Sequence, residues 1–239
     1  MNRFIHLFVL TGLMMFFLPS VAQLDFSSTS NGRVMGVADQ NGVSLLKSKY
    51  SPDIEGSPFV HPDWAIAELL LSSGKQYKNI KAKFNLESNE IYFLDTMNNV
   101  LVPRPGLVKK ISFSLLFSQE GFAYIFKSGY PAIEKQGENY YYQVLAEGKI
   151  DFIRRYYKDI KTIKYDMSGE IKKEFVEGSN YYLFTGGIIK ELKREKMLVA
   201  ELMNDKKTEI DGFILANKLN LKKTTEVQKL VRYYNSISK

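Results

Sequence analysis

Residues 76–86 read QYKNIKAKFNL, and this stretch decides the fold class. Apolar residues occupy alternate positions at Ile80, Ala82, Phe84 and Leu86. Polar residues stand between them at Asn79, Lys81, Lys83 and Asn85. Because successive side chains of a strand point to opposite faces, this alternation predicts a strand with one buried and one solvated face. Such strands are typical of antiparallel sheets.

The pattern continues on both sides of this stretch. Ser73-Gly74-Lys75 predicts a turn that joins residues 65–72 to residues 76–86, and Glu147-Gly148 predicts a second hairpin. Gly178-Ser179-Asn180 is another predicted turn. Further strand-like segments are 90–96, 100–102, 107–118, 122–127, 140–146, 149–157, 160–165, 172–176, 181–184 and 188–192. Since no long helical pattern separates them, we predict a mainly antiparallel sheet, sandwich-like or built of stacked hairpins, rather than a doubly wound parallel sheet.

Near residue 195 the hydrophobic period changes to that of a helix. Apolar residues recur at helical spacing in three groups: Leu198 and Leu202; Ile210, Phe213 and Ile214; Val227, Leu230, Val231 and Tyr234. We expect Asp205 to cap the second helix, and Thr225 with Gln228 to form a capping box for the third. The predicted fold class is therefore α+β, with a C-terminal cluster of two or three short helices packed on the sheet.

The segment before the sheet is poorly patterned. Asn41-Gly42 lies between residues 34–38 and 43–46, which predicts a short hairpin, with a mobile leader as the alternative. The predicted organisation therefore has four consecutive parts: a cleavable signal peptide at 1–22, an irregular leader at 23–63, an antiparallel β region at 64–194 and a helical segment at 195–239.

The first 22 residues have the pattern of a secretory signal. Arg3 precedes a mostly apolar run over residues 4–18, and small residues follow, so we expect cleavage between Ala22 and Gln23. A retained membrane anchor is the alternative, but the run is short for a bilayer span. We therefore expect an exported protein, periplasmic or secreted, without a membrane span after signal removal.

The composition sharpens this expectation. The 239-residue chain contains no cysteine, which excludes disulfides, a cysteine nucleophile and a lipid-modified cysteine after the signal. An exported protein without disulfides suggests a bacterial source. The formal net charge of +7 is a mild excess for this length, so nucleic acid is not an expected partner.

Three short motifs together resemble an uncharacterised family of exported bacterial proteins. They are Gly56-Ser57-Pro58-Phe59, Gly74-Lys75-Gln76-Tyr77-Lys78-Asn79-Ile80 and Tyr233-Tyr234-Asn235. The resemblance would cover most of the mature chain. It implies export and this architecture, and it supplies neither an activity nor a site.

Few motifs point to chemistry. After the signal one histidine remains, His61, and with Asp63 it could serve a serine triad, but Gly-x-Ser-x-Gly is absent and an ordinary loop histidine is the preferred interpretation. The sequence lacks Gly-x-x-x-x-Gly-Lys-Ser/Thr and Gly-x-Gly-x-x-Gly. One histidine also excludes a histidine-rich metal site. We assign no catalytic, metal-binding or cofactor-binding residue and expect no cofactor.

Two functions remain. Tyr140, Tyr141 and Tyr142 lie across a predicted hairpin from Arg154, Arg155, Tyr156 and Tyr157. The preferred interpretation of these clusters is a tyrosine-rich sheet, and the alternative is a ligand-binding surface.

The sequence favours an exported, non-enzymatic binding or interaction protein, with an unknown protein or glycan partner outside the cytoplasm. The alternative is a carboxylate-dependent hydrolase of an extracellular polymer such as a polysaccharide, which requires two facing acids about 5–9.5 Å apart.

Overall fold

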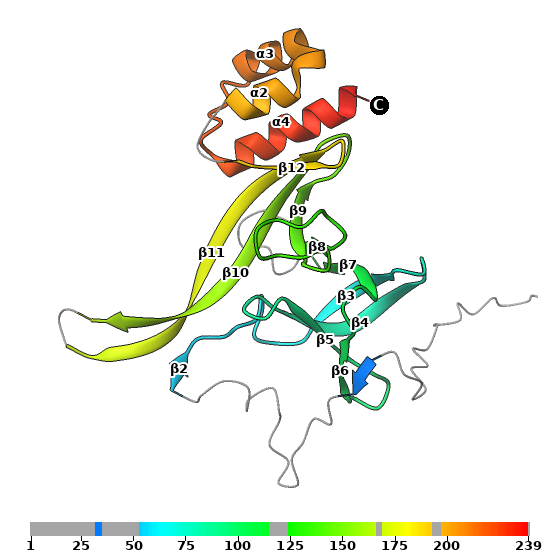
Figure 1. Ribbon diagram of the computed structural model, residues 1–239, viewed down its shortest axis with the longest axis vertical. Coiled ribbons are helices and arrows are strands. Elements are labelled where there is room, and N and C mark those ends of the chain that lie inside the picture. The colour runs from blue at the N-terminus through cyan, green and yellow to red at the C-terminus, as the bar shows by residue number, and fades with distance from the viewer. Residues whose placement is uncertain (1–31, 35–52, 115–123, 166–168, 193–196, 239) are drawn as a thin grey trace, which may run out of the picture.

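The computed structural model describes residues 32–34, 53–114, 124–165, 169–192 and 197–238. Its strands are β1 (Gly32–Val34), β2 (Ile54–Glu55), β3 (Ala65–Leu71), β4 (Gln76–Asn85), β5 (Glu90–Leu94), β6 (Val100–Pro103), β7 (Val108–Phe113), β8 (Ile125–Lys127), β9 (Tyr142–Ala146), β10 (Asp151–Lys164), β11 (Ile171–Thr185) and β12 (Ile188–Glu191). Helices follow at α2 (Met197–Leu202), α3 (Lys207–Ala216) and α4 (Thr224–Ile237), with the short 3₁₀ helix η2 (Asn204–Lys206). Figure 1 shows these helices at one end of a long sheet.

The described strands form one hydrogen-bonded sheet in the order β1-β6-β5-β4-β3-β7-β8-β9-β10-β11-β12. Neighbours in this order are antiparallel, and β2 adds a short parallel pair to β11. Most neighbours are joined by hairpins, while β7 crosses back to pair with β3. The predicted α+β class with mainly antiparallel sheet is therefore confirmed.

Strand β4 has the predicted alternation with one exception. Ala82 and Phe84 are buried and Lys81 is exposed, but Asn85 is also buried, at 1% exposure. Its side-chain Oδ1 accepts the backbone N–H groups of Glu87 and Ser88, at 2.9 and 3.1 Å. The prediction that Asn85 faces solvent was wrong because its side chain closes the β4–β5 turn.

The long hairpin of β10 and β11 projects from the sheet as an arm (Figure 1). The predicted turn at Gly178-Ser179-Asn180 is wrong, since these residues lie within β11 and pair with residues 155–157 of β10. Gly178 is needed because the ring of Tyr157 covers it: a Cβ there would lie 2.6 Å from the Tyr157 hydroxyl. An aromatic ring thus protects a glycine on the neighbouring strand.

A strap consisting of residues 54–59 runs from the outer part of this arm to β4. Within it β2 pairs with β11, and Phe59 bridges to Asn85 at the end of β4. Lys158 on β10 has a side chain that is 12% exposed, and its ammonium donates to the carbonyl oxygens of Ser57 and Phe59 at 2.9 and 3.0 Å. Residues 54–59 of the predicted irregular leader therefore belong to the sheet's packing. The predicted hairpin around Asn41-Gly42 lies outside the described residues, apart from Val34 at the end of β1.

The helices pack on β9 and β10 at the far end of the sheet. Val227, Leu230, Val231 and Tyr234 are each at most 1% exposed, which confirms the predicted apolar stripe and its docking. They share a core with Phe152 of β10. No helix in the described ranges is long and apolar enough to cross a membrane.

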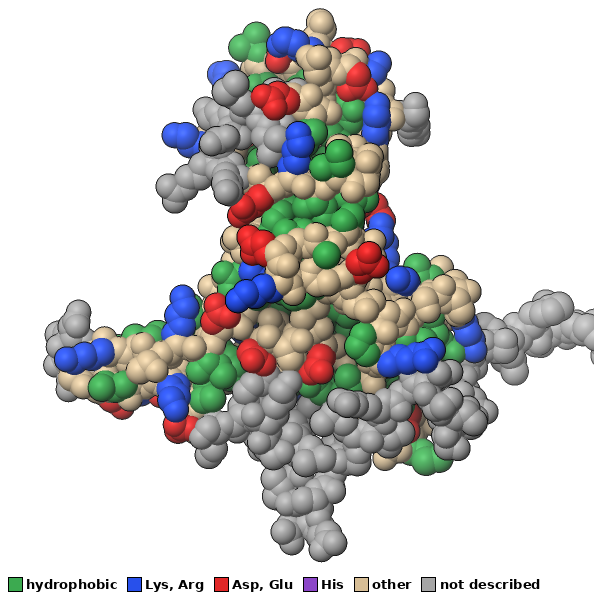
Figure 2. All heavy atoms as spheres, in the orientation of Figure 1, with side chains coloured by type: hydrophobic (Ala, Val, Ile, Leu, Met, Phe, Trp, Pro, Cys, Tyr) green, Lys and Arg blue, Asp and Glu red, His purple; other side chains and the backbone are tan. Residues whose placement is uncertain are grey.

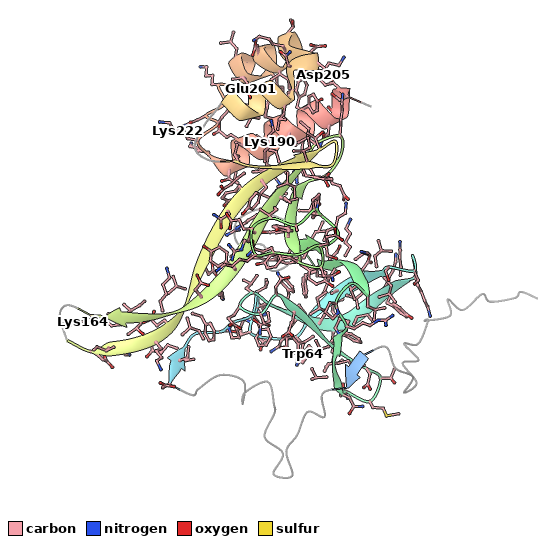
Figure 3. All side chains as sticks on the ribbon, in the orientation of Figure 1. Trp64, Lys164, Lys190, Glu201, Asp205 and Lys222 are labelled. Carbon is pink, nitrogen blue, oxygen red and sulfur yellow. The ribbon has the colours of Figure 1, made fainter. Side chains whose placement is uncertain are left out.

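Both predicted helix caps were wrong. The N-cap residues are Lys206 for α3 and Lys223 for α4, and neither makes a side-chain capping bond. Asp205 instead accepts a hydrogen bond from the Tyr234 hydroxyl at 2.9 Å, and Gln228 donates to the Leu145 carbonyl at 2.6 Å. Tertiary partners thus replaced the local ones. Figure 3 shows Asp205 in the helical cluster and Lys164 at the outer end of the arm.

Candidate functional site

A groove opens where β5 and β6 diverge. The two strands pair at Phe93–Leu101 and Leu94–Val100. Beyond these pairs, residues 87–91 and 102–105 form two sides of a groove, and residues 135–141 form the third. Its volume of about 670 Å³ falls within the range of roughly 300–1,000 Å³ that is typical of small-molecule sites. We call these three segments the Tyr140 groove.

The side chain of Asn89 joins two walls of the Tyr140 groove. Its Oδ1 accepts the backbone N–H of Tyr141 at 2.8 Å, and its Nδ2 donates to the Tyr141 carbonyl at 3.1 Å. The amide therefore replaces a strand partner for Tyr141, just before β9. Asn89 has a φ of 56°, a left-handed conformation that asparagine adopts more readily than most residues. The wall is thus held by two hydrogen bonds between the Asn89 side chain and the backbone of Tyr141.

Tyr140 lies at the centre of a polar and aromatic cluster. Its ring centroid is 5.1 Å from that of Tyr142, and the guanidinium carbon of Arg155 is 6.0 Å from the Tyr140 centroid. Burial raises the pKa of the Tyr140 phenol, while a hydrogen bond and the positive charge of Arg155 act in the opposite direction. The phenol therefore stays protonated at neutral pH and can donate a hydrogen bond.

The groove wall also has unused hydrogen-bonding capacity. In the described part of the chain, buried side-chain atoms without a hydrogen-bond partner are Gln136 Oε1, Tyr142 Oη, Arg155 Nε and Ser238 Oγ. Gln136 lines the groove, and Tyr142 and Arg155 lie beside Tyr140. Leaving a buried polar group unpaired costs about 1–3 kcal/mol, so such groups in a native fold call for an explanation. Of these residues, only Gln136 belongs to the lining of the groove.

Three carboxylates line the same groove: Glu87, Glu90 and Glu138. The Oε2 of Glu90 accepts hydrogen bonds from the hydroxyls of Ser88 at 2.8 Å and Tyr92 at 3.0 Å. Burial and the negative charge of Glu90 raise the pKa of Tyr92 to about 12. Two donated hydrogen bonds favour the ionised carboxylate, whereas a general acid needs the protonated form.

Several carboxyl groups outside the groove also have a pKa that favours the ionised form. The pKa values of Asp95, Glu147 and Asp205 are each lowered. The main cause for Glu147 is a hydrogen bond from Lys127, and for Asp205 one from Lys149. A general acid of the kind that glycoside hydrolases use requires a raised pKa.

The structure divides the tyrosine and arginine clusters between the two faces of the sheet. Tyr141 and Tyr156 belong to the main core, whereas Tyr140 reaches the groove with Arg155 beside it. Arg154 lies on the face of β10 that carries Tyr156, opposite to Arg155. Its guanidinium carbon is 3.9 Å from the Tyr156 ring centroid. The period of two along the strand thus separates neighbours in sequence.

The histidine arrangement differs from a serine triad. The backbone N–H of Asp63 donates to Nδ1 of His61 at 3.2 Å. In a triad, Nδ1 instead carries the proton and donates it to a carboxylate. In the described ranges, no group of three or more His, Cys, Asp or Glu side chains could hold a metal ion.

Comparison with known proteins found no match among family models, curated proteins or solved structures. The groove residues Asn89, Arg104, Gln136 and Glu138 were not singled out from the sequence. Each lies in a polar turn or loop, where such residues are ordinary. The sequence signal for the site was confined to the tyrosine and arginine clusters, of which Tyr140 and Tyr141 line the groove.

Proposed function

We propose that this protein is an exported, non-enzymatic binding protein and that the Tyr140 groove holds its ligand. The observation that carries the proposal is the groove itself, with its firmly held wall and unpaired polar atoms beside Tyr140. Ligand sites are commonly preformed hollows in which a few fixed polar groups orient the ligand. The partner class is a protein or a glycan outside the cytoplasm.

Binding is favoured over hydrolysis by the state of the acids. Glu90 is already held as an acceptor by Ser88 and Tyr92. Hydrolysis of a polymer by two carboxylates remains the competing function because Glu87, Glu90 and Glu138 share the groove.

Export is supported by the signal pattern of residues 1–22. The exported form should begin at Gln23, after cleavage behind Ala22. Intact-mass measurement of protein from the periplasm or the medium tests this expectation. Retention of residues 1–22 in a membrane pellet would contradict it.

Hydrogen-exchange mass spectrometry tests the binding function. The full exported chain is incubated with a panel of soluble polysaccharides and peptides, and each ligand is afterwards examined for cleavage. We expect at least one ligand to slow exchange in residues 87–91 and 135–141 while staying intact. Cleavage products that disappear in Glu90→Gln or Glu138→Gln would establish the hydrolase instead. Protection confined to the arm would refute the groove as the binding site.

A further inference from the structure

We propose that the ligand of the Tyr140 groove is a neutral oligosaccharide; this inference rests on the proposed binding function. The charges on the groove are the first argument. Three acids, Glu87, Glu90 and Glu138, share it with two bases, Arg104 and Lys135. On the face shown in Figure 2, acidic and basic side chains are likewise interspersed over the described surface. A surface of mixed sign does not concentrate a strongly charged ligand.

The hydrogen-bonding groups of the groove are the second argument. The carboxylates accept hydrogen bonds, whereas Arg104 and Lys135 donate them, and the amides do both. The lining residue Gln136 adds an acceptor, since its Oε1 has no partner within the described protein. A ligand that satisfies such a surface must present donors and acceptors at close spacing. Sugar hydroxyls do so because each of them both donates and accepts.

The apolar surfaces in the groove are the third argument. The half-buried ring of Tyr140 and the rings of Pro103 and Pro105 line it. Pyranose rings carry flat faces of C–H groups, which pack on aromatic and proline rings. Tyrosine suits such contact because its ring is apolar and its hydroxyl is polar.

An extended peptide fits the same groove less well. A bound peptide strand needs a row of free backbone groups along a strand edge. The groove borders only Glu90 and Ile91 of β5 and Val102 and Pro103 of β6. Pro103 has no N–H to donate, and two residues of each strand make too short an edge for a row of backbone hydrogen bonds. Side-chain recognition of a sugar therefore accounts for the groove better than backbone pairing does.

Titration calorimetry with the full exported chain tests the ligand class. The probes are cellotetraose, maltotetraose and tetra-N-acetylchitotetraose as neutral sugars, tetragalacturonate as an anionic sugar, and an alanine-rich hexapeptide. We expect at least one neutral tetrasaccharide to bind more tightly than tetragalacturonate and the peptide. Arg104→Ala and Glu138→Gln should each weaken that binding at least tenfold, because both change exposed groove side chains.

Glu201→Gln serves as the matched control for Glu138→Gln, because Glu201 is an exposed glutamate in the helical cluster (Figure 3). It should bind the sugar as the unmodified chain does. Binding of tetragalacturonate or the peptide alone, weakened by the groove variants, would overturn the neutral-sugar ligand and leave the binding function intact. Failure of all three neutral sugars to bind would also overturn it. Sugar binding that neither groove variant weakens would refute the groove as the site of both proposals.

Discussion

The side-chain amide of Asn235 pairs with both backbone groups of Ile150. The Ile150 N–H donates to Asn235 Oδ1 at 2.9 Å, and Asn235 Nδ2 donates to the Ile150 carbonyl at 2.8 Å. Helix α4 thereby supplies the residue before β10 with the bonds of a missing strand. Asn89 does the same for Tyr141, the residue before β9. Two asparagines thus hold the starts of two adjacent strands.

Replacing Asn235 with Ala should lower the free energy of unfolding by about 1–3 kcal/mol, because Ile150 is buried and would lose its partners. Urea denaturation measures the change. Asn217→Ala is the control, since the exposed Asn217 amide makes only a local bond to the Phe213 carbonyl at 2.9 Å, and it should cost less than about 0.5 kcal/mol. Equal losses in the two variants would show that the two Asn235 hydrogen bonds add no more to the free energy of unfolding than the local bond of Asn217 does.

Replacing Lys158 with Met should release the strap from the arm. The ammonium of Lys158 holds the carbonyls of Ser57 and Phe59 and lies 3.5 Å from Glu177. Methionine keeps the apolar stem but cannot donate hydrogen bonds. We expect faster hydrogen exchange in residues 54–60, as local opening becomes easier. Lys161→Met, at an exposed position on the same strand, should leave exchange there unchanged.

Replacing Gly178 with Ala should destabilise the protein by about 1–3 kcal/mol, because the new methyl group would overlap the Tyr157 ring. The loss should shrink in a Tyr157→Ala background, where the overlap is gone. Gly212→Ala is the control of opposite sign: Gly212 lies in α3 with open space at its Cβ position, so stability should rise by about 0.5–1 kcal/mol. Thermal melts of these four variants measure the coupling; an undiminished loss in the double variant would contradict the steric explanation.

Asp205 should make stability depend on pH in the acid range. Hydrogen bonds from Lys149 and Tyr234 lower its pKa below the ordinary value of 3.8. A lowered folded pKa means that this stabilisation is complete above pH 3.8 and is lost as the pH falls through the folded pKa. Asp205→Asn should therefore reduce stability at pH 6 and flatten its decline toward pH 2.

The control for this pH dependence is Asp211→Asn. In the unmodified chain the Asp211 carboxylate pairs with Lys207, one helical turn away, at 2.6 Å. Urea midpoints at pH 6 and pH 2 should then differ as in the unmodified chain. If the midpoints of Asp205→Asn at pH 6 and pH 2 differed as much as those of the unmodified chain, Asp205 would not contribute to the acid sensitivity.

Local patterning was sufficient to predict much of the fold. The alternation in residues 76–86 and the helical stripe of Val227, Leu230, Val231 and Tyr234 both predict which side chains are buried, and the structure confirms them except at Asn85. Burial of apolar faces depends on residue spacing along the chain, so it is readable without tertiary information.

Residue spacing did not predict which distant groups the side chains would contact. Asp205 and Gln228 have the spacing of helix caps, yet they bond to Tyr234 and Leu145. Gly178 reads as a turn residue, yet it lies in the middle of a strand under Tyr157. In each case a contact from a distant segment outweighed a local preference worth about 1 kcal/mol.

The sequence by itself determined the antiparallel sheet, the helical end and the burial of their apolar faces, because these follow from periodicity. Only the tertiary structure decided the Tyr140 groove. Its walls come from residues 87–91, 102–105 and 135–141, which are held together by Asn89 on Tyr141. Hydrogen-bond geometry across 52 residues of chain leaves no period in the sequence, so a groove built from three separate segments is visible only once the chain has folded.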